Sequence, residues 1–280
     1  MNYRHQFHAG NFADVFKHIF LSRAVLHLCA KPAPFRIIET HAGSGLYDLL
    51  GPEAGKTAEW HGGIGNLMAA EAEPRVRRLI EPYLHIVAPL LDKDPKRYGG
   101  SPWIAKALLR RQDRMILCEL HPRAFAALLA NFGYDARIKL FQTDGYARLK
   151  ALLPPVERRG LVLIDPPFEA ADEFAKATEA IETAWRKWAT GIYMLWFPVK
   201  DAGACASFAA NLAGRGIKRV LRLELQTGPA TPQGPLARCG LIIVNPPFQL
   251  DADAKILLPW LAAVLGSGEP GFLIEWLSGE

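Results

Sequence analysis

The stretch Leu161-Val-Leu-Ile-Asp-Pro-Pro-Phe168 joins an unbroken apolar run to an acidic residue, two prolines and an aromatic ring. A short apolar run is typical of a strand that is buried on both faces of a parallel sheet. The prolines remove two backbone donors and fix an extended turn, so they end the strand and direct the Asp165 carboxylate outward. In a doubly wound sheet, ligands bind at this carboxyl edge of the strands. The stretch therefore predicts a ligand-facing turn, although a simple proline stop after a buried strand is the alternative.

Other short apolar runs extend this strand into a sheet. We expect strands at Phe35–Thr40, Met115–Glu119, Ile138–Gln142, Ile192–Trp196, Val220–Leu225, Leu241–Val244 and Phe272–Trp276. Helical patterns lie between most of them, including Asp14–Ala30, a stretch that starts at Pro122, and Ala170–Trp188. Strands that alternate with helices predict an α/β fold with a mostly parallel sheet covered on both faces. Because strands crowd together near the C-terminus with fewer helices between them, we expect an antiparallel edge there.

Residues 50–100 separate the first strand from the second by far more than one helix. This segment contains five prolines and reads as a small, mainly helical insertion. We therefore expect one main domain built from residues 1–49 and 101–280, with residues 50–100 as an insertion subdomain. Its seven basic and seven acidic residues make it no obvious electrostatic surface for nucleic acid.

The composition indicates a soluble, reduced, cytoplasmic protein. Of the 280 residues, half are apolar and 22% are charged, and no apolar stretch approaches the roughly 18 residues that a membrane-spanning helix needs. The N-terminal residues lack the apolar centre of a secretory signal. The four cysteines lie far apart, without the spacing of a zinc site or a disulfide framework, so we predict no metal. A net charge of +5 permits contact with a polyanion but does not demonstrate it.

Small and acidic residues follow the predicted strands in an order that suits a nucleotide-like cofactor. The turn Ala42–Gly45 follows the first strand, Glu119 ends the second, and Asp144 opens an Asp-Gly turn after the third. A carboxylate at the second position commonly accepts hydrogen bonds from ribose hydroxyls, and Asp144 could accept from an adenine amino group. Each feature alone has a structural alternative, namely a strand–helix turn, an exposed acid or a simple Asp-Gly turn. Their joint order favours the cofactor site.

A second copy of the turn motif, Asn245-Pro-Pro-Phe248, follows a later apolar run. Asp165 ends the fourth strand, directly after the three cofactor-facing turns, whereas Asn245 arrives two or more strands later, at the expected antiparallel edge. We therefore assign the substrate site to Asp165, Pro166 and Phe168. The carboxylate and an adjacent carbonyl supply the two acceptors that an exocyclic amine needs, and the Phe168 ring offers a face for stacking on a base. We expect Phe248 to be a partly buried aromatic residue that contributes to stability.

Two other stretches allow a structural or a functional interpretation. The N-terminal run from Tyr3 to His18 is rich in hydrogen-bonding and aromatic side chains, and its simplest interpretation is a solvated helix start. Ser101 before Pro102 most simply caps a helix, with Ser at the N-cap and Pro at the first helical position.

Seven motifs, taken together, resemble a known family. They are Tyr3-Arg-His-x-Phe-His-Ala-Gly-Asn-x-Ala-Asp-Val-x-Lys-His18, Thr40-His-Ala-Gly-Ser-Gly45, Gly100-Ser-Pro102, Glu119-Leu-His-Pro122, Asp144-Gly145, Arg158-Arg-Gly-Leu-Val-Leu-Ile-Asp-Pro-Pro167 and Asn245-Pro-Pro247. With them the chain resembles the RlmJ-type ribosomal RNA large-subunit adenine-N6 methyltransferases over essentially its whole length. The N-terminal run is the most specific motif, whereas Asp-Pro-Pro-aromatic is shared by many amino-methyltransferases. The family's fourth motif residue is commonly Tyr, and Phe168 stacks equally well but cannot donate a hydroxyl hydrogen bond.

The resemblance implies a class I methyltransferase fold that uses S-adenosylmethionine (SAM) as methyl donor and no metal. It implies that the acceptor is the N6 amino group of an adenine in 23S rRNA. We expect the protein to be a cytoplasmic monomer without membrane contact. Matching positions imply SAM contacts at His18, His41, Ser101, Glu119, Asp144, Gly145 and Asp165. They imply catalysis at Asp165, Pro166 and Phe168, and an RNA contact at Tyr3, with His5 and Lys17 beside it.

Two other functions fit the same residues. A DNA adenine methyltransferase, or another amino-group methyltransferase such as one that acts on protein amides, would share the Asp165 turn. A non-catalytic RNA-binding module would keep the fold without the chemistry. The intact set of Glu119, Asp144 and Asp165 argues against the second alternative.

Overall fold

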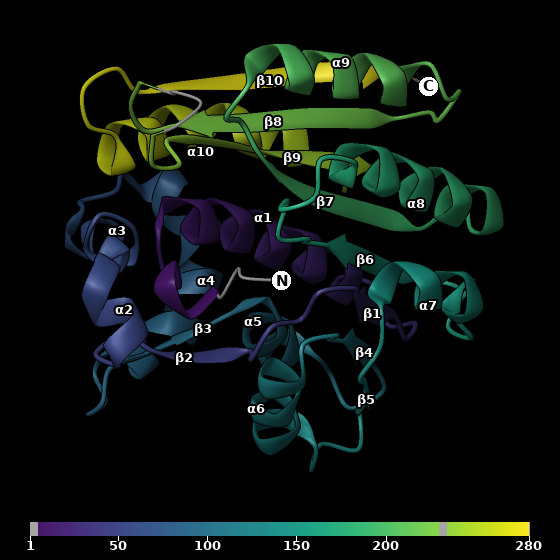
Figure 1. Ribbon diagram of the computed structural model, residues 1–280, viewed down its shortest axis with the longest axis horizontal. Coiled ribbons are helices and arrows are strands. Elements are labelled where there is room, and N and C mark those ends of the chain that lie inside the picture. Colours follow the sequence, from purple (N-terminus) through teal and green to yellow (C-terminus); the bar gives the residue numbers. More distant parts are fainter. Residues whose placement is uncertain (1–4, 230–233, 280) are drawn as a thin grey trace.

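A computed structural model describes residues 5–229 and 234–279, and within them one eight-stranded sheet runs through the molecule (Figure 1). Its strand order is β10-β8-β9-β7-β6-β1-β4-β5. The strands are β1 (Arg36–Glu39), β4 (Arg114–Cys118), β5 (Ile138–Phe141), β6 (Gly160–Ile164), β7 (Ile192–Pro198), β8 (Val220–Gln226), β9 (Arg238–Val244) and β10 (Gly271–Ser278). Strands β5, β4, β1, β6 and β7 are parallel neighbours, and β9, β8 and β10 continue the sheet in antiparallel pairs. The predicted parallel sheet with an antiparallel C-terminal edge is confirmed.

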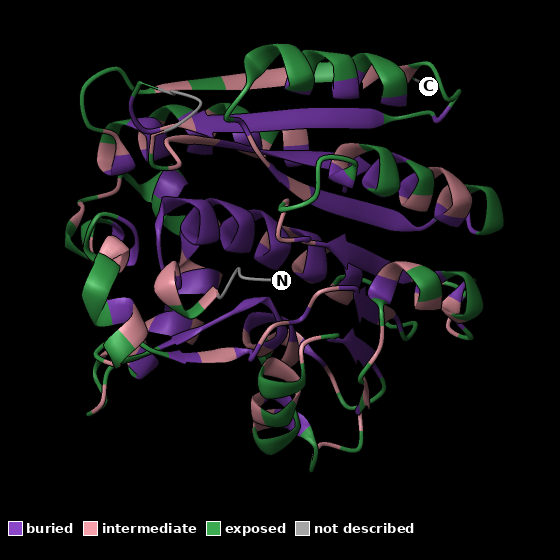
Figure 2. Ribbon diagram, in the orientation of Figure 1, coloured by how far each residue is buried: buried purple, intermediate pink, exposed green. Residues whose placement is uncertain are grey.

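Helices cover both faces of this sheet. One face carries α1 (Phe12–Cys29), α5 (Ser101–Leu108), α6 (Pro122–Phe132) and α10 (Leu250–Leu265), and the other carries α7 (Gly145–Leu152), α8 (Glu173–Lys187) and α9 (Ala202–Ala213). Successive strand residues point to opposite faces, so Ile37 packs in one apolar layer and Ile38 in the other. Both residues are buried, as are most residues of the central strands (Figure 2). Among the helices of the described residues, none is long and apolar enough to cross a membrane.

Helix α1 is buried on nearly every side. It contacts α5, α4, α10, β6 and β9, and fourteen of its eighteen residues are buried. A helix that is apolar all round belongs inside a core rather than on a surface. The polar residues Asp14, Lys17 and His18 are buried with it, so they must find partners inside the protein.

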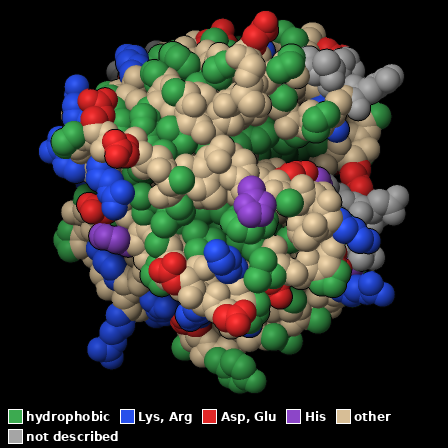
Figure 3. All heavy atoms as spheres, turned by 90° about the vertical axis from the view of Figure 1, so that its left-hand side faces the viewer, with side chains coloured by type: hydrophobic (Ala, Val, Ile, Leu, Met, Phe, Trp, Pro, Cys, Tyr) green, Lys and Arg blue, Asp and Glu red, His purple; other side chains and the backbone are tan. Residues whose placement is uncertain are grey.

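Residues 50–100 form a mainly helical segment on one side of the sheet. They contain α2 (Pro52–Thr57), the 3-10 turn η2 (Glu59–His61), α3 (Ile64–Ala69), α4 (Pro74–Leu91) and β3 (Arg97–Gly99), and β3 pairs antiparallel with β2 (Leu46–Asp48). Helix α4 packs on α1 and α10, so its apolar residues join the main core. On this side of the molecule, Lys and Arg side chains are interspersed with Asp and Glu (Figure 3). The treatment of residues 50–100 as a separate subdomain stays a prediction.

The turn Asn245–Phe248 and Asp165 lie at opposite ends of the strands. Strand β9 runs antiparallel to β7, so Val244 pairs with Tyr193 near the start of β7, whereas Ile164 pairs with Leu195 further along it. Two expectations for this turn are wrong. Strand β9 lies inside the sheet, because β8 and β10 both add beyond it, and the Phe248 side chain is 81% exposed. Leu250, two residues later, enters the core in its place.

The structure of this turn predicts which of its residues stabilises the fold. The Asn245 amide donates to the carbonyls of Ala189 and Gly191, both at 2.8 Å, and the residue adopts a φ of +51°. Asn245→Ala should therefore lower the free energy of unfolding by about 1–3 kcal/mol, because it leaves two carbonyls without this donor. Phe248→Ala removes an exposed ring and should change that free energy by less than about 0.5 kcal/mol. Urea unfolding of both variants checks this order, and equal destabilisation would contradict it.

Candidate active site

A cavity of about 1110 Å³ opens at the carboxyl edge of the parallel strands. The turns after β1, β4, β5, β6 and β7 line it, together with the N-terminal segment and the start of α1. This is the edge at which the sequence predicts a ligand. Its volume exceeds the roughly 300–1,000 Å³ of a typical small-molecule pocket, which leaves room for two ligands side by side.

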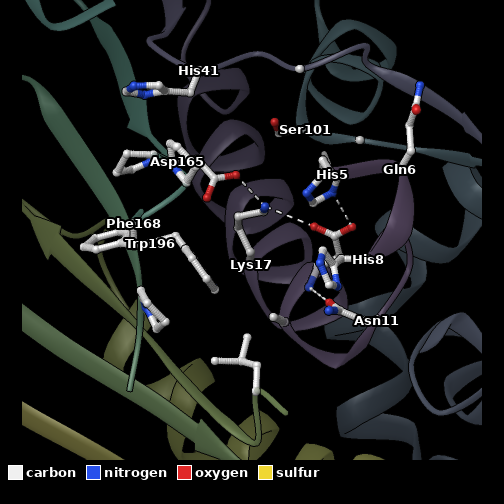
Figure 4. A pocket seen from close by; sticks show the side chains of 18 of the residues that line it. His5, Gln6, His8, Asn11, Lys17, His41, Ser101, Asp165, Phe168 and Trp196 are labelled. Carbon is white, nitrogen blue, oxygen red and sulfur yellow. Dashed lines mark hydrogen bonds and ion pairs between the residues drawn. The ribbon is translucent and has the colours of Figure 1, made fainter. Parts of the chain in front are cut away.

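Asp165 lies in a buried charge network (Figure 4). The Lys17 ammonium donates to Asp165 Oδ2 at 2.6 Å and lies 3.0 Å from Asp14 Oδ1. On the far side of Asp14, His5 Nε2 lies 2.9 Å from Oδ2. Although burial opposes it, the interactions with His5 and the Lys17 ammonium hold the pKa of Asp14 well below its usual range. The network therefore joins two carboxylates through one ammonium and fixes the Asp165 side chain at the cavity.

The turn after Asp165 holds Phe168 in an unusual backbone conformation. Its φ is +47°, in the left-handed region that bulky residues rarely adopt, and such strain is common at binding sites. The ring packs at 5.0 Å from Phe174 and edge-on at 6.1 Å from Trp196. Trp196 also lines the cavity, with the Lys17 ammonium 5.9 Å from its ring. The sequence analysis did not identify Trp196 as a site residue. Its position near the end of β7, the strand beside β6, could have indicated that it lines the cavity.

Two strand-end carboxylates lie on the other side of the cavity. The oxygens of Glu119 accept from the backbone N–H groups of Gly43 at 2.8 Å and His121 at 2.7 Å, so they hold the glycine turn in place. A carboxylate accepts more than two hydrogen bonds, so lone pairs remain for hydroxyl donors. Asp144 Oδ1 accepts from Tyr146 N at 2.8 Å and caps α7, while Oδ2 has no hydrogen-bond partner among the described residues. The structural and the ligand-binding interpretations of Asp144 are therefore compatible.

The turn after β1 and the turn after β5 lie so close together that only glycine fits at the point of contact. A Cβ at Gly145 would lie 2.0 Å from the Thr40 carbonyl oxygen, so any other residue there would force the two turns apart. His41 lines the cavity beside them, with Nδ1 2.8 Å from the Thr40 hydroxyl and its ring against Tyr146. Burial lowers the pKa of His41 to about 4, so its ring is neutral at neutral pH. His41 therefore adds no charge to this part of the cavity wall at neutral pH.

Buried polar atoms without partners lie next to the cavity. The expected N-cap role of Ser101 is wrong, because Gly100 is the N-cap and the Ser101 hydroxyl instead donates to Glu39 Oε2 at 2.7 Å. Burial raises the pKa of Glu39 to about 8. Glu39 Oε1 and His18 Nε2 have no hydrogen-bond partner among the described residues, which is rare for buried polar atoms and fits a polar ligand nearby. Glu39 was also missed, although it is the acid that ends the first strand.

The cavity brings the predicted site residues together. Those that line it are His5, Lys17, His18, His41, Ser101, Glu119, Asp144, Gly145, Asp165, Pro166 and Phe168. Tyr3 lies outside the described residues. Lys17 is buried and paired with carboxylates rather than presented at the surface, and its RNA contact and that of His5 stay predictions.

Known proteins match this chain over nearly its whole length. A family profile described as "Ribosomal RNA large subunit methyltransferase D, RlmJ" matches residues 32–278. Two proteins named "Ribosomal RNA large subunit methyltransferase J" are 38% identical in Haemophilus influenzae and 37% in Escherichia coli, each over all of both chains. A crystal structure of a Legionella pneumophila protein is 35% identical with a TM-score of 0.85, and the match covers 96% of this chain and 98% of that one.

The buried Glu39 predicts a pH-dependent stability. Its pKa of about 8 in the folded protein exceeds the 4.5 of an unperturbed glutamate, so the folded state keeps a proton that the unfolded chain loses. The free energy of unfolding should therefore fall as pH rises from about 4.5 to 8. Glu39→Gln keeps an acceptor for the Ser101 hydroxyl but does not titrate. Its free energy of unfolding should therefore fall less between pH 5 and pH 8, and at pH 8 it should be higher than that of the wild type. Urea unfolding at pH 5 and pH 8 without added ligand measures this, and identical pH slopes would contradict it.

Proposed function

This chain belongs to the RlmJ family of ribosomal RNA large subunit methyltransferases, and we propose that it transfers a methyl group from SAM to the N6 amino group of an adenine in 23S rRNA. One observation carries the proposal. The Asp165–Phe168 turn faces the same cavity as the strand-end carboxylates Glu119 and Asp144. Methyl transfer needs donor and acceptor held together in one enclosed space, and this cavity is large enough for both.

The cofactor would bind at the turns after β1, β4 and β5. Glu119 has lone pairs for the two ribose hydroxyls, and Asp144 Oδ2 suits an adenine amino group. His18, His41, Ser101 and Gly145 line the same cavity. His18 Nε2 has no hydrogen-bond partner among the described residues, which supports a polar ligand there. When bound, SAM supplies a methyl group on a positively charged sulfur, which makes that methyl group electrophilic.

The target adenine would bind at Asp165 and Phe168. Leaving its stack costs the base a few kcal/mol, and stacking on an aromatic ring returns roughly 1–3 kcal/mol. Asp165 and the adjacent backbone carbonyl accept the two N6 protons, which turns the nitrogen lone pair toward the centre of the cavity. As the new N–C bond forms, the bond between the methyl carbon and sulfur would break, so positive charge would pass from sulfur to N6. That charge develops beside the Asp165 carboxylate, and a fixed group of this kind is worth roughly 3–4 kcal/mol. After the transfer N6 releases one proton to solvent, so it need not be deprotonated beforehand.

Lys17 positions the Asp165 carboxylate for this task. It occupies Oδ2 at 2.6 Å and leaves Oδ1 without a partner among the described residues, free for the amine. An ammonium beside a developing positive charge would by itself be unfavourable. Asp14 offsets it, because two carboxylates surround the one ammonium. We propose RNA contacts at Tyr3, His5 and Lys17, and we propose that the protein works as a cytoplasmic monomer.

Methyl transfer from labelled SAM to 23S rRNA, followed by nucleoside analysis, tests the function. The expected product is N6-methyladenosine in RNA, formed faster than in a DNA oligonucleotide of the same sequence. A preference for DNA would favour a DNA adenine methyltransferase. SAM-independent RNA binding without transfer would favour a non-catalytic RNA-binding module.

Removing the catalytic carboxylate should abolish turnover without unfolding the protein. Asp165→Ala takes away an acceptor for N6 and the charge beside it, so single-turnover methylation should slow by about two or more orders of magnitude. Thermal unfolding of the same sample shows whether the variant is folded. A folded variant with activity within tenfold of the wild type would remove Asp165 from the mechanism.

The two aromatic turns should behave differently. Phe168→Ala loses stacking worth roughly 1–3 kcal/mol, which corresponds to a drop of about five- to 150-fold in methylation efficiency. Phe168→Tyr keeps the ring face and should stay near the wild type. Phe248→Ala is the matched control at the opposite end of the strands and should methylate normally. If Phe248→Ala abolishes methylation in a folded protein while Phe168→Ala does not, the catalytic turn is at Asn245.

A further inference from the structure

Glu59, in η2 of the inserted segment, binds the N-terminal segment directly. Its two carboxylate oxygens each lie 3.0 Å from His8 Nδ1, and Oε2 also accepts from Asn11 Nδ2 at 3.0 Å. The main chain adds a bond from Ile64 N to the Gly10 carbonyl at 2.8 Å. One carboxylate from residues 50–100 therefore holds two side chains of the segment that precedes α1.

The two segments also meet at a backbone distance that only glycine permits. A Cβ at Gly63 would lie 2.1 Å from the Gly10 carbonyl oxygen and 2.4 Å from the Asn11 carbonyl carbon. Gly10 itself adopts a φ of +78°, a conformation that favours glycine. The contact therefore leaves little freedom in how the insertion sits against residues 8–11.

Asn11 connects Glu59 to the charge network at Asp165. Its side-chain oxygen accepts from Asp14 N at 3.0 Å and caps α1, while its amide nitrogen donates to Glu59. Asp14 binds Lys17, and Lys17 binds Asp165 (Figure 4). A line of direct contacts thus runs from the insertion to the turn that receives the adenine.

We propose that Glu59 is a positioning residue for the RNA, which makes the helical insertion part of the RNA site. It holds His8 and Asn11 so that the N-terminal segment, with His5, stays at the mouth of the cavity. The inference rests on the proposed function, because it names what residues 50–100 contribute to it.

The electrostatics of the pair agree with this role. The hydrogen bond to Glu59 raises the pKa of His8, and, although burial opposes it, the bonds from His8 and Asn11 lower the pKa of Glu59. Both side chains are 36% exposed, so the ion pair contributes little to the stability of the fold. Its loss should therefore move the segment without unfolding the protein.

Glu59→Ala tests the proposal, with Glu81→Ala as the matched control. Glu81 is also in the insertion and also pairs with a histidine, His85 at 3.9 Å, but within α4. Glu59→Ala should lower kcat/KM for RNA by about ten- to a hundredfold, as expected when a positioning contact is lost, and leave the Kd for SAM within about twofold. Glu59→Gln keeps one acceptor oxygen and should recover part of the loss. Glu81→Ala should match the wild type.

A pH profile and a double variant show whether His8 and Glu59 act together. The charged groups that face His8 are Glu59 from η2, Asp14 from α1 and Lys200 after β7. Since Glu59 raises the pKa of His8, the ion pair forms below that pKa and is lost above it, so kcat/KM for RNA should decline on the alkaline side. In Glu59→Ala, which has no His8–Glu59 ion pair to lose, this decline should disappear. The double variant His8→Ala, Glu59→Ala should have a kcat/KM for RNA no lower than that of the less active single variant, because both changes break the same contact.

Two results would overturn the inference. One is a folded Glu59→Ala protein with kcat/KM for RNA within twofold of the wild type. The other is an equal loss of affinity for SAM, which would place the effect on the cofactor side. Amide hydrogen exchange gives a readout without RNA, because Glu59→Ala should speed exchange at Gly10 and Asn11. If the wild type methylates no RNA at all, the proposed function fails, and the exchange data still report whether Glu59 holds the segment.

Discussion

The buried Lys17 between Asp14 and Asp165 is the interaction on which the rest of the structure depends. Burying an ammonium is costly unless it is paired, and here two carboxylates pair it, one from its own helix and one from a turn 148 residues away. The same three charges fix α1 in the core, set the direction of the Asp165 side chain and anchor His5. Stability and the proposed chemistry therefore share one set of contacts.

Patterns that are local in the sequence predicted most of the fold. The strands are short apolar runs because both faces of the sheet are covered, and Pro166 and Pro167 leave a visible stop where β6 ends. Contacts between distant residues leave no such trace, which is why Glu59, Trp196 and the pairing of Lys17 were not foreseen. The burial of Phe248 was predicted wrongly for the same reason, since an aromatic residue after an apolar strand looks buried until its neighbours are known. Ser101 shows the limit of capping rules, because its hydroxyl donates to the buried carboxyl group of Glu39 instead of capping the helix.

The two sides of the cavity are built differently. On the side of the proposed cofactor site, backbone turns, the neutral His41 and the carboxylate of Glu119 form the wall, and Gly145 leaves no room for a side chain beside Thr40. On the side of the proposed acceptor site, aromatic rings and a charge network surround Asp165, and the contacts come from separate parts of the chain. The proposed function therefore pairs a preformed cofactor site with a composite site for the RNA.

The burial of α1 bears on how the chain reaches this arrangement during synthesis. Helix α1 is synthesised before its neighbours α5, β6 and α10, and α10 begins only at Leu250. Until those elements emerge, this apolar helix has no interior to enter, so nascent chains would expose it while the rest of the domain is synthesised. Factors that shield hydrophobic segments at the ribosomal exit would then act first on the segment that carries Lys17.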